Sequence, residues 1–148
     1  MPATSPDELS VQQWIDAWGA EVAAVRLTNA RSRFSDDVVA FGTFADVVVG
    51  LDSLFRDQWS QVWPKIEDFV FLTDEMQTLV SPDRLMAVAV VGWSSTGIDE
   101  HGERFPRPGR ATVVLSRPTV DADWSGVHTN FSLGRGVPQA SFGSRISV

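Results

Sequence analysis

The fold is decided by residues 124–133, whose sequence is WSGVHTNFSL. Side chains in this run alternate with a period of two, which is typical of a β-strand whose two faces have different surroundings. The polar side chains share one face: His128, Asn130 and Ser132. The less polar side chains share the other face: Val127, Thr129, Phe131 and Leu133. A second alternating run, residues 110–117, comes before it across a short loop, so the two runs predict neighbouring strands.

The N-terminal part of the chain predicts helices. Ser5 and Glu8 form a capping-box pattern. Apolar residues then recur at helical spacing: Val11, Trp14, Ile15, Trp18, Val22 and Val25. The sequence next predicts a helix break, a turn and a short strand: residues 29–32, 35–37 and 38–42. A second helical pattern covers residues 51–63, and Pro64 ends it.

The C-terminal part predicts a meander of strands: residues 69–81, 85–98, 104–117 and 124–134. We expect the first to be irregular near residues 73–75, and Pro106 and Pro108 indicate a frayed start to the third. Helices followed by antiparallel strands predict an α+β fold. We expect one cone-shaped domain over residues 1–148, with N-terminal helices packed on the concave face of a curved, mainly antiparallel sheet. A cavity is expected between that face and the helices.

Composition excludes several classes of protein. The chain has 148 residues, a net charge of −7 and no Cys, so disulfides, thiolate metal sites and Cys nucleophiles are excluded. No basic stripe for nucleic acid is present, and no apolar run approaches the roughly 20 residues needed to cross a bilayer. The N-terminus lacks the pattern of a signal peptide, so a cytoplasmic location is expected. The two His fall on different predicted elements, and we expect neither a metal nor a cofactor.

Three segments together carry a resemblance to a known family. They are the aromatic-rich first helix with residues 34–42, the helix at 51–63, and the Trp-x-x-Val-His-x-x-x-Ser pattern of the last strand. The chain resembles the nuclear-transport-factor-2-like superfamily, with its cystatin-like cone, in the SnoaL-like and ketosteroid-isomerase-like branch. It is also similar to the association (hub) domain of calcium/calmodulin-dependent kinase. The resemblance implies a homodimer formed through the convex sheet face, with these residues facing the partner subunit: His128, Asn130 and Ser132. The family often has a second His where this chain has Asn130.

The resemblance also implies which residues point toward the cavity. They are mostly aromatic and come from both the helices and the sheet: Trp14, Trp18, Phe34, Trp59, Trp63, Trp93, Val113, Thr129 and Phe131. Val127 would share this side of the last strand. An apolar, aromatic cavity suits a flat hydrophobic ligand, because ligand pockets are mostly apolar with few polar groups. The alternative interpretation is that these side chains simply fill the core.

Established isomerase chemistry is disfavoured by two replacements. The family's base-bearing Asp falls at Gly42, and its Tyr donor falls near Trp18; neither replacement can perform the original proton transfer. His128 and Ser132 lie four residues apart on one strand, roughly 13 Å at about 3.3 Å per residue, too far to form a catalytic pair within one chain. Catalytic residues, and whether the protein is an enzyme, are left open.

Arginines give the last sequence signal. Arg107 and Arg110 flank a Pro-Gly step, where they could bind an acidic ligand or pair with the acids of residues 99–103; the pairing is favoured. The pocket arginines of the hub domain fall at apolar positions here: Trp93, Val113 and Phe131. The pocket is therefore expected to prefer apolar ligands over carboxylates. Two hypotheses follow: a protein that binds or transforms a small hydrophobic molecule (isomerase-, cyclase- or dehydratase-like at most), or a non-catalytic dimerisation module.

Overall fold

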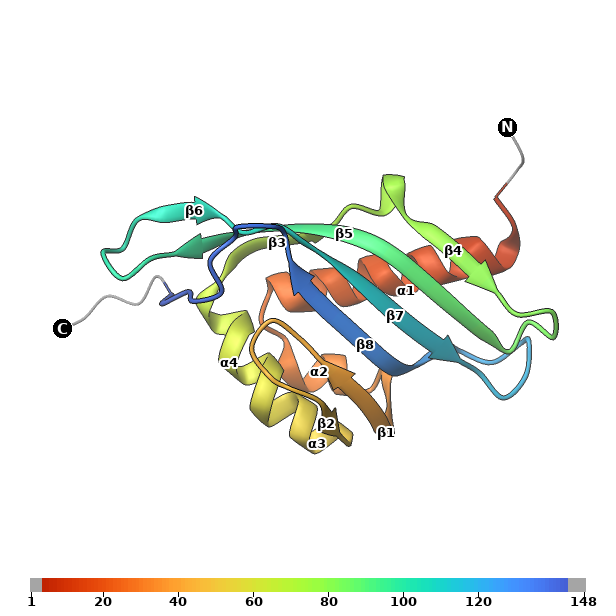
Figure 1. Ribbon diagram of the computed structural model, residues 1–148. Coiled ribbons are helices and arrows are strands. Elements are labelled where there is room, and N and C mark those ends of the chain that lie inside the picture. The colour runs from red at the N-terminus through yellow and green to blue at the C-terminus, as the bar shows by residue number, and fades with distance from the viewer. Residues whose placement is uncertain (1–3, 144–148) are drawn as a thin grey trace.

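A computed structural model of the protein describes residues 4–143 (Figure 1). A long N-terminal helix crosses one face of a curved, mostly antiparallel sheet, and a second helical segment closes the end of the sheet on the same side. This arrangement confirms the predicted α+β class with helices on the concave face. Among the described residues, no helix has both the length and the apolar character needed to span a membrane.

The first helix, α1 (Pro6–Ala23), begins with the predicted capping box. Ser5 Oγ accepts from the backbone N–H of Glu8 over 3.1 Å, and Glu8 Oε1 accepts from the backbone N–H of Ser5 over 3.3 Å. The helix ends earlier than predicted, because Val25 has a φ of 55° and turns the chain into α2 (Leu27–Arg31). The expected break at residues 29–32 was therefore wrong. A β-branched residue in a left-handed conformation is uncommon, so the sequence held no signal for it.

The sheet has the order β2-β1-β8-β7-β5-β3, and β4 and β6 also pair with β5. Its strands are β1 (Phe34–Phe41), β2 (Val48–Val49), β3 (Glu67–Phe71), β4 (Gln77–Val80), β5 (Met86–Ile98), β6 (Arg104–Pro106), β7 (Gly109–Ser116) and β8 (Ser125–Leu133). The pair formed by β1 and β8 is parallel, and the other described pairs are antiparallel. β8 lies inside the sheet, because one of its edges pairs with β1 and the other with β7.

Three predicted strands differ in detail from the structure. The polar residues 35–37, predicted as a turn, belong to β1, where the register shifts between Phe34 and Val39. The segment at 69–81 divides into β3 and β4 around a 3₁₀ turn at Thr73–Glu75, the position where irregularity was expected. The segment at 104–117 divides into β6 and β7 at residues 107–108. The break between β6 and β7 contains Arg107, which lines the cavity described below.

The helical segment after Gly50 is not a uniform α-helix. It consists of α3 (Leu51–Leu54), a π-helical turn (Phe55–Trp59), α4 (Ser60–Val62) and a 3₁₀ turn (Trp63–Lys65). A π turn holds one more residue than an α turn, and such turns are frequent at functional sites. Here the wider turn accompanies the burial of two consecutive side chains, Gln58 and Trp59.

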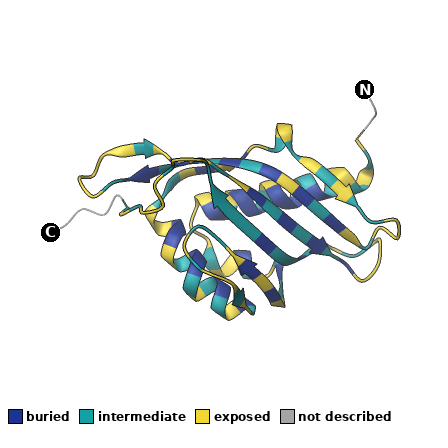
Figure 2. Ribbon diagram, viewed as in Figure 1, coloured by how far each residue is buried: buried dark blue, intermediate teal, exposed yellow. Residues whose placement is uncertain are grey.

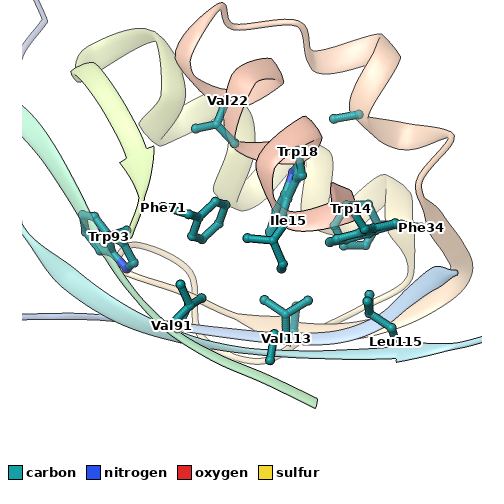
Figure 3. Close-up of a cluster of buried hydrophobic side chains, with 14 of the residues drawn as sticks. Trp14, Ile15, Trp18, Val22, Phe34, Phe71, Val91, Trp93, Val113 and Leu115 are labelled. Atoms are coloured by element: carbon teal, nitrogen blue, oxygen red, sulfur yellow. The ribbon is translucent and has the colours of Figure 1, made fainter. Parts of the chain in front are cut away.

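The core lies between α1 and the sheet. In β5 and β7 every second residue is buried, which produces the banding in Figure 2. Val91, Val113 and Leu115 point from the strands toward Ile15 and Trp18 of α1 (Figure 3). Period-two burial on the strands meets period-3.6 burial on the helix, as the sequence pattern predicted.

A bulge in β8 changes which residues face this core. Thr129 pairs with Val113 and His128 with Val114, but Leu115 pairs with Gly126, so Val127 is the extra residue of the bulge. Placing Val127 on the pocket side was therefore wrong. Gly126 lies against Phe34, where an added Cβ would come within 2.4 Å of the Phe34 ring. The ring occupies the space that a side chain at residue 126 would need.

Candidate functional site

A small cavity lies between α1, the helical segment 54–66 and the concave face of the sheet. Its free volume is about 30 Å³, enough for one or two water molecules. Six of the predicted pocket residues line it: Trp18, Trp59, Trp63, Trp93, Thr129 and Phe131. The predicted residues thus converge on one space, and their side chains fill most of it.

Three predicted pocket residues lie elsewhere in the core. The ring of Phe34 packs between Trp18 and Trp59, with centroid distances of 4.9 and 5.1 Å. Trp14 contacts Trp18 and Phe34, and Val113 lies beneath α1 (Figure 3). None of these three lines the cavity. The core-filling alternative holds for them, because α1 covers this end of the sheet.

The cavity walls are aromatic side chains in mutual contact. Trp63 stacks on Trp59 at 4.7 Å and Trp93 stacks on Phe69 at 5.6 Å. Phe131 makes an edge contact with Trp18 at 5.5 Å. Offset and edge contacts at these distances are favourable beyond the area they bury. Enlarging the cavity therefore requires coordinated movement of several rings.

Gly42, the position to which the resemblance assigns the family's base, also lines the cavity. The missing side chain is replaced in space by an amide from the π turn: an added Cβ at Gly42 would lie 2.5 Å from Nε2 of Gln58. Gln58 Oε1 accepts from the backbone N–H groups of Phe44 and Ala45, over 3.1 and 2.7 Å. A hydrogen-bonded amide thus occupies the place where a carboxylate would act as a base.

A buried cation forms another part of the cavity wall. Arg107 is 1% exposed and lines the cavity, instead of pairing with the acids of residues 99–103 as expected. Its Nη2 donates to the carbonyl oxygen of Gln139 over 2.7 Å, and it makes no ion pair within residues 4–143. Burial lowers the pKa of the Arg107 guanidinium from its ordinary value. The predicted apolar, aromatic wall thus also contains a cation that the favoured pairing did not place there.

Several buried donors near the cavity have no acceptor. Within the described chain these are Nε of Arg107 and the indole N–H groups of Trp18 and Trp93. Trp14, outside the cavity, is in the same state, so an indole alone does not mark a site. Buried polar groups are normally hydrogen-bonded, so three residues of the cavity wall carry donors that a ligand with acceptors could satisfy once the side chains move.

Acids and bases are missing from the wall in the described part of the molecule. No Asp, Glu or His lines the cavity, and no cluster of three or more potential metal-ligating residues occurs among residues 4–143. Proton abstraction by a side chain therefore has no base there. The wall offers hydrogen-bond donors and no side-chain base.

The polar row of β8 lies on the other face of the sheet. Nδ1 of His128 donates to the carbonyl oxygen of Val39 over 2.6 Å, and Arg110 donates to Oγ of Ser132 over 3.2 Å. Asn130 pairs with Thr112 of β7 and is half-buried. The row is accessible from outside and does not reach the cavity.

Comparison with known proteins places this arrangement in a family. Residues 11–135 match the model of the SnoaL-like domain. The chain belongs to the SnoaL-like domain family. No curated protein sequence gives a significant match.

Solved structures share the fold of this SnoaL-like domain at low sequence identity. A ketosteroid isomerase-like protein from Erwinia carotovora atroseptica superposes with a TM-score of 0.73 at 15% identity, covering 87% of this chain and 97% of that one. A proposed calcium/calmodulin-dependent protein kinase II association domain from Xanthomonas campestris gives 0.72 at 17%, covering 93% and 94%. A nuclear transport factor 2-like protein from Salmonella enterica gives 0.70 at 17%, covering 90% and 98%. At these identities the likeness shows the fold alone.

Sequence reasoning did not place several lining residues in this SnoaL-like domain's cavity, and three of them shape the site: Gln58, Phe69 and Arg107. Gln58 had no signal, because only a π turn points it inward beside Trp59. Phe69 was identified as a strand residue but not as part of the wall. Arg107 was named as a possible ligand contact, but its pairing with the acids of residues 99–103 was favoured; its place between two prolines, which cannot continue a regular strand pairing, was the signal against that pairing.

Proposed function

We propose that this SnoaL-like domain is a small-molecule binding protein whose aromatic cavity takes a small, flat, largely apolar molecule. The observation that carries the proposal is the wall itself: stacked aromatic rings and three buried donors without acceptors. A pure packing core would gain nothing from unpaired donors, since each one costs free energy when buried. The free volume is small, so binding requires the rings to move apart.

Binding is favoured over isomerase chemistry by the cavity's composition. Gly42 supplies no base, and the space in front of it is filled by the amide of Gln58. Any reaction in this cavity would depend on holding a molecule in a dry, oriented position. The ketosteroid isomerase-like neighbour shares the fold and does not by itself assign that activity here.

The test uses a ring that lines the cavity and a matched residue that does not. Trp93→Ala removes a buried indole and should bind indole more tightly than the wild type in calorimetric titration, because the variant leaves a space of that shape. Val113→Ala, which changes a buried sheet residue outside the cavity, should bind indole as the wild type does. Equal indole binding by the wild type and Trp93→Ala would overturn the assignment of the pocket.

A second candidate function is self-association through the outer face of the sheet. Exposed apolar side chains lie on that face: Val39, Phe41, Met86 and Val90. They flank the half-buried polar row that begins at His128, and apolar patches rimmed by polar groups mark protein interaction sites. The fold neighbour described as an association domain supports this candidate.

The dimer proposal is tested separately from the pocket. The double variant His128→Ala with Asn130→Ala should shift the protein toward monomer at a given concentration in light scattering. Lys65→Ala, on the helical side of the molecule, is the control and should leave the mass unchanged. A double variant whose mass matches the wild type across the whole dilution series would overturn the interface assignment.

A further inference from the structure

Arg107 differs from the other buried arginine of the described chain. Arg117 is 7% exposed and is neutralised: its Nη2 donates to Asp7 over 2.8 Å, and its guanidinium lies 3.9 Å from the Trp124 ring centroid. Arg107 is more deeply buried, and within residues 4–143 its guanidinium has neither a carboxylate partner nor an aromatic ring beneath it. Buried charges in proteins are normally paired, so an unpaired one calls for an explanation.

The backbone holds Arg107 in this position rigidly. Its N–H donates to the carbonyl oxygen of Ser95 over 2.9 Å, and its carbonyl accepts from the Ser95 hydroxyl over 2.6 Å. Pro106 and Pro108 on either side have fixed φ angles. Neither neighbouring residue can donate to a ladder, and the strand divides here into β6 and β7. The guanidinium is therefore directed inward by a locked backbone.

Arg107 lines two spaces. One is the aromatic cavity, and the other is an outer cavity of about 150 Å³ closed by residues 139–142. The outer cavity has a mixed wall, with apolar side chains such as Phe44, Ile66 and Phe142 beside polar ones, and its volume is about that of an apolar cavity known to accept a benzene ring. Lys65 also lines the outer cavity and makes no ion pair among the described residues, while no Asp or Glu lines either space. The side chains that line the two spaces thus include two cations and no carboxylate.

Among the described residues Arg107 has one side-chain acceptor, and a ligand could take the place of that acceptor. It is the carbonyl oxygen of Gln139, in a segment after the last strand, and it leaves Nε without a partner. That segment is anchored independently of Arg107, because the N–H of Phe142 donates to the carbonyl of Ile98 over 2.8 Å. A guanidinium offers a planar fork of donors that matches a carboxylate with two parallel hydrogen bonds.

We propose that the ligand is a small carboxylate with a single unsaturated ring, whose carboxylate binds Arg107 and whose ring occupies the apolar space beside it. This inference rests on the proposed ligand-binding function and specifies the class of ligand. The carboxylate neutralises the buried guanidinium, and the ring matches the size of the outer cavity and the aromatic character of the inner one.

The test compares benzoate with benzamide, which has the same shape and no charge. Binding is followed by NMR, using the indole N–H resonances for the inner cavity and the amides of residues 139–142 for the outer one. We expect benzoate to bind the wild type at least tenfold more tightly than benzamide and to shift both sets of signals. Arg107→Met should abolish that preference. Arg110→Met is the control, because Arg110 is exposed and bonded to Ser132.

The possible results separate the inference from the proposed function. Equal binding of benzoate and benzamide, with shifted indole signals, would overturn the carboxylate assignment and leave the aromatic pocket standing. Benzoate binding that shifts only residues 139–142 would support the Arg107 site and count against the inner pocket. Binding of neither compound at millimolar concentration would overturn the carboxylate site, while the indole titration of Trp93→Ala would decide the pocket independently.

Discussion

The unpaired guanidinium of Arg107 makes a prediction about stability that is opposite in sign to the usual effect of removing a buried residue. Arg107→Met keeps the length and much of the volume of the side chain but removes the charge. We expect the variant to be more stable than the wild type in the absence of ligand. The reason is that the charge is buried without a carboxylate and its Nε has no acceptor.

The magnitude follows from the contacts of the side chain. The variant loses one charged hydrogen bond, to Gln139, which contributes about 1.5–3 kcal/mol. It is relieved of the desolvation of an unpaired cation, which costs several kcal/mol. It is also relieved of an unpaired donor, which costs about 1–3 kcal/mol. The relieved costs exceed the lost hydrogen bond by at least about 1 kcal/mol. Each kcal/mol raises the melting temperature of a domain of this size by roughly 2–4 °C.

The assay is urea denaturation at pH 7 and fixed protein concentration, followed by tryptophan fluorescence. Arg117→Met is the matched control, because Arg117 is also buried but is paired with Asp7 and packed on Trp124. The control should lose about 2 kcal/mol, since it leaves a carboxylate with one partner fewer. The reasoning is refuted if the two variants lose stability by similar amounts. In that case Arg107 would be an ordinary structural residue.

Two further predictions concern the rest of the chain. Hydrogen bonds from Arg84 and then Arg117 hold the pKa of Asp7 well below its usual range of about 3.9. The contribution of Asp7 to stability is therefore full above about pH 5 and is lost as the pH falls through 4 and below. Asp7→Asn should lower the urea midpoint at pH 7 and flatten the fall of that midpoint toward pH 3. The control is Asp74→Asn, at an exposed residue with no ion pair among the described residues, which should leave the dependence of the midpoint on pH unchanged. Parallel pH profiles for Asp7→Asn and the wild type would contradict the linkage. In the cavity, Gly42→Ala should destabilise the fold because the added Cβ meets Gln58 at 2.5 Å. Adding Gln58→Ala should recover part of the lost stability in a double-mutant cycle. Additive effects of the two substitutions would show that the two side chains do not compete for the same space.

Much of the fold could be predicted because its information is local. The capping box at Ser5 and the period-two runs of β5, β7 and β8 appear in the structure close to where the sequence places them. Alternation along a strand follows from backbone geometry alone, so it specifies the buried face before any partner strand is known. Alternation put Thr129 and Phe131 on one face of the strand, the family resemblance implied that this face is the concave one, and both residues line the cavity.

The errors arise where the backbone leaves its regular period. Val25 ends α1 with a positive φ, and the bulge at Val127 shifts the row that faces the core. Each irregularity changes the face of the helix or strand on which the following side chains lie. A bulge depends on the pairing of two strands, so a single strand's sequence does not reveal it.

The sequence by itself determined the α+β class, the helix start, the strand faces and the absence of a family base at residue 42. Only the tertiary structure decided what stands in place of that base, because Gln58 reaches Gly42 through a π turn in a distant segment. It also decided that Arg107 is buried among aromatic rings without a carboxylate. The physical reason is that periodicity assigns a side chain to a face of its own element, whereas the charge and space around it are set by residues far away in the chain.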